Sequence, residues 1–203
     1  SFVVITVIAN RRSLETAAAV GIVEKIMSFM FLGPSAMLST VSALGAQNIG
    51  AGKPERAVQT LRYAILLVSS LTLTVSVAMQ FIAEPVVALF TDSAAADGAA
   101  VILLGGQYLR GYVWDCFFGG IQFSFSGYFC ARGRSELSFL HNLLSILLVR
   151  VPGAYLASEL FPATLFPMGL ASTCGSVLSV LVCAAVFLLL RRGDRRNGEG
   201  AGA

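Results

Sequence analysis

The chain has 203 residues, of which 56% are hydrophobic and only 12% are charged, whereas soluble domains carry about 25% charged residues. This composition excludes a disordered chain, a soluble DNA-binding module and an ordinary cytosolic enzyme. Three stretches, residues 26–52, 63–83 and 160–190, contain no charged side chain. Each is long enough for the roughly 20 residues that an α-helix needs to cross a bilayer. We therefore expect an all-α membrane protein, a polytopic helical bundle.

The apolar segments and the turn residues between them predict five complete transmembrane helices and the remnant of a sixth. The remnant is the short apolar run at residues 2–9, and the complete spans are residues 15–44, 54–83, 97–131, 136–158 and 164–190. We expect a kink at Gly33-Pro34 and a bend at Pro152-Gly153, because proline interrupts helical hydrogen bonding. Residues 1–190 would then form the six-helix unit, and residues 191–203 a polar, disordered tail.

The lysines and arginines of the connecting segments predict the orientation of the bundle. One side carries only Arg11 and Arg12, and the other side carries nine cations: Lys53, Arg56, Arg62, Arg132, Arg134, Arg191, Arg192, Arg195 and Arg196. Cytoplasmic loops carry the excess of Lys and Arg in membrane proteins. We therefore place the nine cations and the C-terminal tail in the cytoplasm, and the chain in the cell (inner or plasma) membrane. The net charge of +3 then reflects topology, and no nucleic-acid partner is expected.

Two carboxylates inside the predicted spans are candidates for ion coupling. Asp115 lies about 15 Å along its helix, at 1.5 Å per residue, and Glu24 lies at a comparable depth. Ionisable groups inside a bilayer are costly and usually functional, so Asp115, with Glu24 behind it, would take up and release Na⁺ or H⁺. The alternative for Asp115 is a structural ion pair with Arg150 on the neighbouring span. Lys25 is a poor partner for Glu24, because adjacent helical residues do not face each other.

Polar residues recur on single faces of four of the five spans, at multiples of the helical repeat, and predict helices around a polar cavity. The candidate cavity-lining residues are Tyr108, Trp114, Gln122, Ser126, Ser28 and Met27. Aromatic faces and methionine side chains would bind lipophilic cations. The alternatives are that small polar residues line helix–helix contacts, and that the aromatic residues face lipid or pack within the bundle. We interpret His141 as a residue near a helix start that forms a local hydrogen bond.

The sequence lacks the motifs of an enzyme or a metal site. Residues 45–53 are glycine-rich and end in Lys53, but a P-loop needs glycine where Gln47 stands and Ser or Thr where Pro54 stands. The four cysteines have no CxxC spacing, and one histidine is too few for a metal cluster or a Ser/His/Asp set. We expect no enzymatic activity, no metal and no cofactor, with Na⁺ or H⁺ as the coupling ion.

The same glycine-rich segment resembles a motif of a known family. Residues 47–53, followed by Arg56-Ala57, look like the signature loop of the MATE family, the multidrug and toxic compound extrusion transporters. Further segments that resemble the family are residues 84–91, 108–110, 126–128, Gly133 and residues 148–152. The loop residues are expected to be structural and to tie helix ends together: Gln47, Asn48, Gly50, Gly52 and Arg56.

The resemblance implies two six-helix lobes, of which this chain would be most of the C-terminal one, with the N-terminal lobe of the same chain and the lipid bilayer as its partners. It implies an exporter that exchanges cationic or amphiphilic compounds for Na⁺ or H⁺ by alternating access. Asp115 falls in the tenth span, where family members carry a functional acidic residue. Two alternatives stay open. One is a lipid-linked precursor or polysaccharide flippase of related fold, for which only Arg110 and Arg150 lie within the spans. The other is a non-transporting membrane scaffold.

Overall fold

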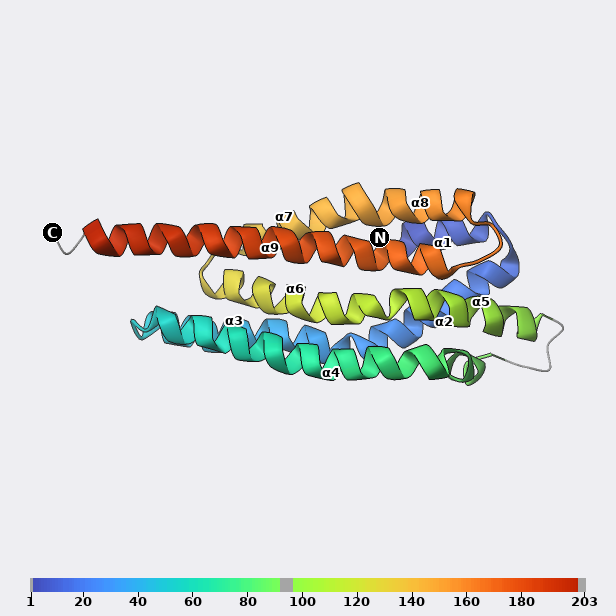
Figure 1. Cartoon of the computed structure of the whole chain (residues 1–203), viewed down its shortest axis with the longest axis horizontal. Coiled ribbons are helices and arrows are strands. Elements are labelled where there is room, and N and C mark those ends of the chain that lie inside the picture. The colour runs from blue at the N-terminus through green and yellow to red at the C-terminus, as the bar shows by residue number, and fades with distance from the viewer. Residues whose placement is uncertain (1, 92–96, 201–203) are drawn as a thin grey trace.

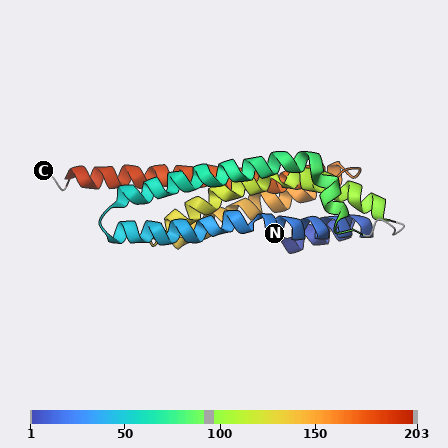
Figure 2. The ribbon, with the colours of Figure 1, turned by 90° about the horizontal axis from the view of Figure 1, so that it is seen from below.

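The computed structural model describes residues 2–91 and 97–200, and it contains no strand within these ranges. The elements, in chain order, are α1 (Phe2–Asn10), α2 (Leu14–Met30), α3 (Leu32–Gly50), α4 (Pro54–Ala88), α5 (Gly98–Tyr112), α6 (Trp114–Ala131), α7 (Ser135–Ser145), the π-helical turn η1 (Ile146–Arg150), α8 (Val151–Leu160) and α9 (Phe166–Gly200). The long helices run along one axis of the bundle, and α9 projects beyond the α3–α4 turn at one end (Figure 1, Figure 2).

The helices are long enough to span a membrane. By length and apolar composition, four segments of the described chain can do so: Leu14–Gly50, Pro54–Ala88, Ser135–Leu160 and Phe166–Gly193. The remaining predicted span, residues 97–131, consists of α5 and α6, which follow each other along the bundle (Figure 1). The short helix α1 corresponds to the truncated sixth span. The expected all-α, polytopic bundle is therefore confirmed.

The first long span breaks at Phe31 rather than at Gly33-Pro34, which corrects the predicted kink. Pro34 lies in the first turn of α3, where a missing backbone N–H removes no helical hydrogen bond. A proline ring also clashes with the carbonyl group four residues earlier, which here belongs to Met30. That carbonyl oxygen instead accepts a weak hydrogen bond from the Cys116 thiol at 3.6 Å. The break caused by Pro34 therefore lies on the N-terminal side of the proline, at Phe31.

The predicted span 97–131 is also broken, at Val113, where the sequence has neither proline nor glycine. Side chains of α4 bind backbone oxygens at this point: Ser76 Oγ donates to the Val113 oxygen at 3.2 Å, and Gln80 Nε2 donates to the Arg110 oxygen at 3.1 Å. Side chains that insert into the helical hydrogen-bond ladder are a known cause of kinks. The break is thus a tertiary effect of α4.

The bend predicted at Pro152-Gly153 takes the form of a π-helical turn. The turn η1 covers Ile146–Arg150 and directly precedes Pro152, which lies in the first turn of α8. A π-helical turn inserts extra backbone into a helix and is frequent at functional sites. Its last residue is Arg150.

The helix α9 continues as far as Gly200 and so includes most of the predicted polar tail. A helix that is already nucleated adds further residues at little cost. The disorder expected for residues 191–203 stays a prediction, and residues 201–203 lie outside the described residues.

Two close helix crossings fix α5 and α6 against their neighbours. A Cβ atom on Gly127 of α6 would lie 2.6 Å from the Leu38 oxygen of α3, and one on Gly169 of α9 would lie 2.5 Å from the Tyr108 oxygen of α5. Only glycine permits such an approach of helix backbones. These crossings hold the polar faces of α5 and α6 toward the bundle interior.

Candidate functional site

Glu24 is a carboxylate held by two tyrosines inside the bundle. Its side chain projects from α2 and is buried, with 9% of the residue exposed. The Tyr108 hydroxyl donates to Glu24 Oε1 at 3.2 Å, and the Tyr112 hydroxyl donates to Oε2 at 3.4 Å. The two tyrosines are four residues apart on α5 and therefore share one face of the helix. Lys25 is exposed. Among the described residues no cationic side chain forms an ion pair with Glu24.

Asp115, by contrast, is paired with a cation. Arg150 Nη2 donates to both carboxylate oxygens of Asp115, at 2.9 and 3.0 Å, and Asp115 is fully buried. The same Nη2 atom donates to Ser176 Oγ of α9 at 2.6 Å, and the Ser176 hydroxyl lies 3.5 Å from Gln122 Oε1. Of the two roles that the sequence left open for Asp115, the geometry supports the ion pair with Arg150.

The position of Arg150 depends on α9 as well as on η1. Its side chain lies directly against Gly175, where a Cβ atom would overlap the Arg150 Cγ atom. The Gly175 oxygen accepts a hydrogen bond from Ser145 Oγ at 2.6 Å. The adjacent residues Gly175 and Ser176 thus provide both the space and a hydrogen-bond acceptor for the guanidinium group.

Asp115 lines a cavity of about 280 Å³, and Glu24 lies behind one of its wall residues. Asp115, Arg150 and Tyr112 line it directly, and Tyr112 joins it to Glu24. The rest of the wall is aromatic, polar or small: Phe31, Gly119, Gln122, Phe123, Asn142, Ile146 and Ser176. The rings of Phe31 and Phe123 meet edge to face with centroids 6.1 Å apart. The cavity therefore combines an ion pair, amide groups and aromatic surface.

The structure distributes the predicted cavity residues over several environments. Gln122 lines the cavity. Tyr108 binds Glu24, and Met27 packs in the apolar core around α2 and α5. Ser28 Oγ donates to the backbone oxygen of Glu24 at 2.8 Å. Trp114 directly precedes Asp115 in the sequence. Its side chain is half-buried and is not among the residues that line the cavity.

Ser126 belongs to a second polar cluster, centred on His141. His141 is 2% exposed, and its Nε2 atom lies 2.9 Å from Ser126 Oγ while Nδ1 lies 2.6 Å from Ser179 Oγ. The local hydrogen bond predicted for this histidine is therefore wrong. His141 links α6, α7 and α9, because burial requires a partner for each ring nitrogen and only the neighbouring helices supply them.

The predicted signature loop is a tight helix-to-helix connection. Gln47, Asn48 and Gly50 belong to the last turns of α3, and Arg56 is exposed in the first turn of α4. Asn48 Nδ2 donates to the Leu44 oxygen at 2.7 Å. Gly52 has φ +70°, a conformation that glycine adopts without strain. These contacts lie within the loop and its helix ends, and the structural role expected for the loop residues stays a prediction.

Comparison with known proteins identifies the family. The family model MatE matches residues 1–156 of the 203. The chain belongs to the MatE family. This confirms the resemblance carried by the signature loop, and together with the apolar helices it makes the chain part of a multi-pass membrane protein.

Two relatives define how much of a MatE protein the chain represents. The "FAD transporter" of Shewanella oneidensis is 28% identical over 147 residues, which cover 71% of this chain and 31% of the relative. A crystal structure of MATE in complex with MaL6 superposes with a TM-score of 0.82 at 15% identity, over 94% of this chain and 43% of that one. The chain therefore spans less than half the length of these relatives and has the fold of one lobe.

Proposed function

We propose that this MatE chain forms the C-terminal lobe of a secondary active efflux transporter that exchanges cationic or amphiphilic compounds for Na⁺ or H⁺ by alternating access. The observation that carries the proposal is Glu24, a buried carboxylate that has two hydroxyl donors and no cationic partner among the described residues. A carboxylate buried without a compensating charge is strongly disfavoured. Uptake of H⁺ or Na⁺ neutralises it, and release of the ion leaves it charged again.

Glu24 is a better coupling candidate than Asp115 for an electrostatic reason. The charge of Asp115 is compensated by Arg150 at 2.9 Å, so a cation that binds Asp115 must first displace the guanidinium group. Glu24 requires no such displacement, and the oxygens of its carboxylate and of Tyr108 and Tyr112 are the type of ligand that hard cations prefer. From the sequence alone, Asp115 is the first candidate and Glu24 the second; we propose the opposite order.

The cavity supports a substrate site that is completed by the other lobe. Its volume of about 280 Å³ is just below the range of roughly 300–1,000 Å³ typical of small-molecule sites. Phe31, Phe123 and Tyr112 offer aromatic surface to an amphiphilic compound. In a two-lobed transporter the N-terminal lobe would supply the facing wall.

A second candidate is the export of an anionic, phosphate-bearing substrate such as a flavin dinucleotide. It is favoured by Arg150, a guanidinium group that lines the cavity, and by the name of the Shewanella oneidensis relative. Arginine binds phosphate bidentately, and neutralisation of Asp115 would free Arg150 to do so. The flippase alternative has less support, because Arg110 is bound to Glu84 at 3.2 Å.

The complete transporter in sealed vesicles tests the proposal. An imposed Na⁺ or H⁺ gradient should drive uphill movement of ethidium, a lipophilic cation, and Glu24→Gln should abolish that movement. The matched control is Glu136→Gln, which removes an exposed carboxylate at the start of α7. Movement of FAD in place of ethidium would favour the second candidate. If neither gradient moves either compound, the transporter proposal fails and the scaffold alternative is favoured.

A further inference from the structure

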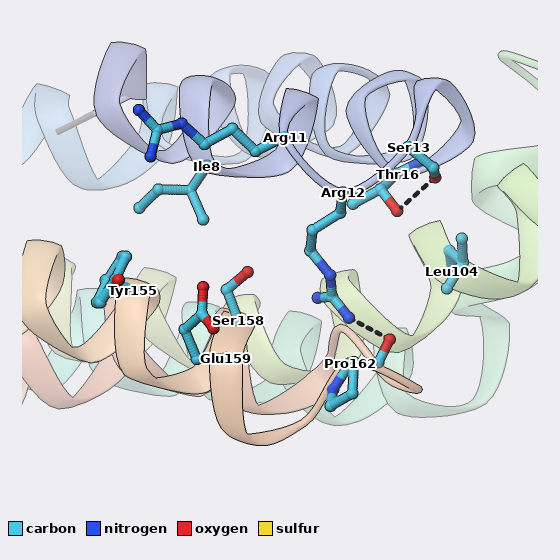
Figure 3. Close-up of a pocket in the computed structure, with 10 residues that line it drawn as sticks. All are labelled: Ile8, Arg11, Arg12, Ser13, Thr16, Leu104, Tyr155, Ser158, Glu159 and Pro162. Atoms are coloured by element: carbon cyan, nitrogen blue, oxygen red, sulfur yellow. Dashed lines mark hydrogen bonds between the residues drawn. The ribbon is translucent and has the colours of Figure 1, made fainter.

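A larger cavity of about 530 Å³ lies away from the central site, at the end of the bundle opposite the C-terminus (Figure 1, Figure 3). It lies between two walls, one formed by the end of α1 with the α1–α2 turn and the other by the C-terminal half of α8 (Figure 3). Arg11 and Arg12 lie on the first wall and Glu159 lies on the second. Neither the ion pair nor the carboxylate of the central site touches this cavity.

The charged groups of this cavity are incompletely satisfied. Arg12 Nη2 donates to the oxygen of Phe161 at 3.2 Å and to that of Pro162, which joins the α1–α2 turn to the α8–α9 loop. The other terminal nitrogen, Arg12 Nη1, is buried and has no hydrogen-bond partner in the described part of the chain. Arg11 and Glu159 are exposed in the cavity, and neither has an ion-pair or hydrogen-bond partner among the described residues. The cavity thus offers N–H donors on one wall and a carboxylate on the other.

The surroundings place the cavity at the edge of the membrane. The sequence neighbours of its lining residues on α2, α8 and the α8–α9 loop are apolar and exposed: Leu14, Leu156, Leu160 and Phe161. Tyr155 lines the cavity and is half exposed, as is common for tyrosine at a membrane–water interface. Arg11 and Arg12 are also the two cations that depart from the positive-inside pattern. A bound anion at this end of the bundle would account for them.

We infer that this cavity binds the headgroup of a phospholipid that carries a primary ammonium group. The phosphodiester accepts hydrogen bonds from Arg11 and from Nη1 of Arg12, and the ammonium group donates to Glu159. The cavity carries cationic side chains on one wall and a carboxylate on the other, as a zwitterionic headgroup requires, whereas a simple anion would leave Glu159 unpaired and repelled. Ile8 and Leu104, which also line the cavity, contact the start of the acyl chains.

The test uses the delipidated complete transporter and three lipids with the same acyl chains. Native mass spectrometry measures the binding of phosphatidylethanolamine, phosphatidylcholine, which has no N–H donor, and phosphatidylglycerol, which has no ammonium group. The variants are Arg11→Gln and Glu159→Gln, which change exposed side chains that form no hydrogen bond or ion pair with the described residues. The matched controls are Arg62→Gln and Glu136→Gln, two exposed residues outside the cavity.

We expect phosphatidylethanolamine to bind about tenfold more tightly than phosphatidylcholine, in line with one charge-assisted hydrogen bond. Glu159→Gln should abolish this preference, and Arg11→Gln should weaken all three lipids, while the controls change neither result. The inference is overturned if Glu159→Gln keeps the preference, or if Arg11→Gln weakens binding no more than Arg62→Gln does. It is also overturned if inorganic phosphate alone displaces phosphatidylethanolamine, because the cavity would then be a site for free anions.

Discussion

Tyr108 and Glu24 are 84 residues apart in the sequence, yet the Tyr108 hydroxyl donates a hydrogen bond of 3.2 Å to the Glu24 carboxylate. The bond joins α5 to α2 within the buried part of the bundle. Together with Tyr112 it gives each carboxylate oxygen a neutral donor, so that Glu24 is oriented without being neutralised by a cation. The coupling role proposed for Glu24 depends on this arrangement.

Removal of the Tyr108 hydroxyl should destabilise the protein. Tyr108→Phe leaves Glu24 Oε1 buried without its donor, which costs about 1–3 kcal/mol for a buried polar group. The free energy of unfolding, measured by denaturant titration in detergent micelles, should fall by that amount. Tyr63→Phe is the matched control, because Tyr63 is 71% exposed on α4. Equal effects of the two substitutions would show that the Tyr108 hydroxyl makes no contribution.

The pair of Asp115 and Arg150 should behave as one unit. Either Asp115→Asn or Arg150→Gln leaves a buried charge without its partner, which costs about 3–5 kcal/mol, whereas the double variant should cost less than the sum. A double-mutant cycle on the free energy of unfolding measures this coupling.

The control for that cycle is the pair of Glu55 and Arg191, 3.5 Å apart, in which the Glu55 side chain is 77% exposed. A surface pair of this kind contributes about 0–1 kcal/mol. Additive effects of Asp115→Asn and Arg150→Gln, as at the surface pair, would contradict the assignment of a buried ion pair.

A single methyl group at Gly175 should disturb the central site. Gly175→Ala places a Cβ atom onto the Arg150 side chain, which is held in place by Asp115 and Ser176. Overpacking of this kind costs about 1–3 kcal/mol, and it should be visible as a lower unfolding free energy. Gly21→Ala, where a Cβ atom meets nothing within 4 Å, should be neutral or slightly stabilising. If both substitutions behave alike, Gly175 does not shape the position of Arg150.

The sequence predicts the fold well because hydropathy and charge spacing directly reflect the bilayer, and the signature loop is a local motif. It predicts the site less well because the expectation of a single polar face on the span 97–131 assumes one continuous helix. At the break, Ser76 of another helix donates a hydrogen bond to the Val113 oxygen, and the sequence around position 113 does not indicate this contact. The break separates Tyr108, which binds Glu24, from Asp115, which binds Arg150.

His141 is a second residue whose contacts could not be predicted from the sequence. Its partners Ser126 and Ser179 lie 15 and 38 residues away in the sequence, so that only the packing of α6, α7 and α9 brings them together. A lone histidine in an apolar helix carries no signal that would identify such partners. The pair of Asp115 and Arg150 could be considered from the sequence only because both residues are rare charges inside predicted spans.

The most direct test of the account compares uphill and downhill transport by Glu24→Gln and by wild type in the complete transporter. Glu24 is not among the residues that line the cavity. If Glu24 carries the coupling ion, the variant should therefore bind substrate within about threefold of wild type, a difference of less than about 1 kcal/mol. It should also equilibrate substrate across the vesicle membrane, but it should show no accumulation driven by a Na⁺ or H⁺ gradient. Gradient-driven accumulation by Glu24→Gln at the wild-type level would contradict the central claim.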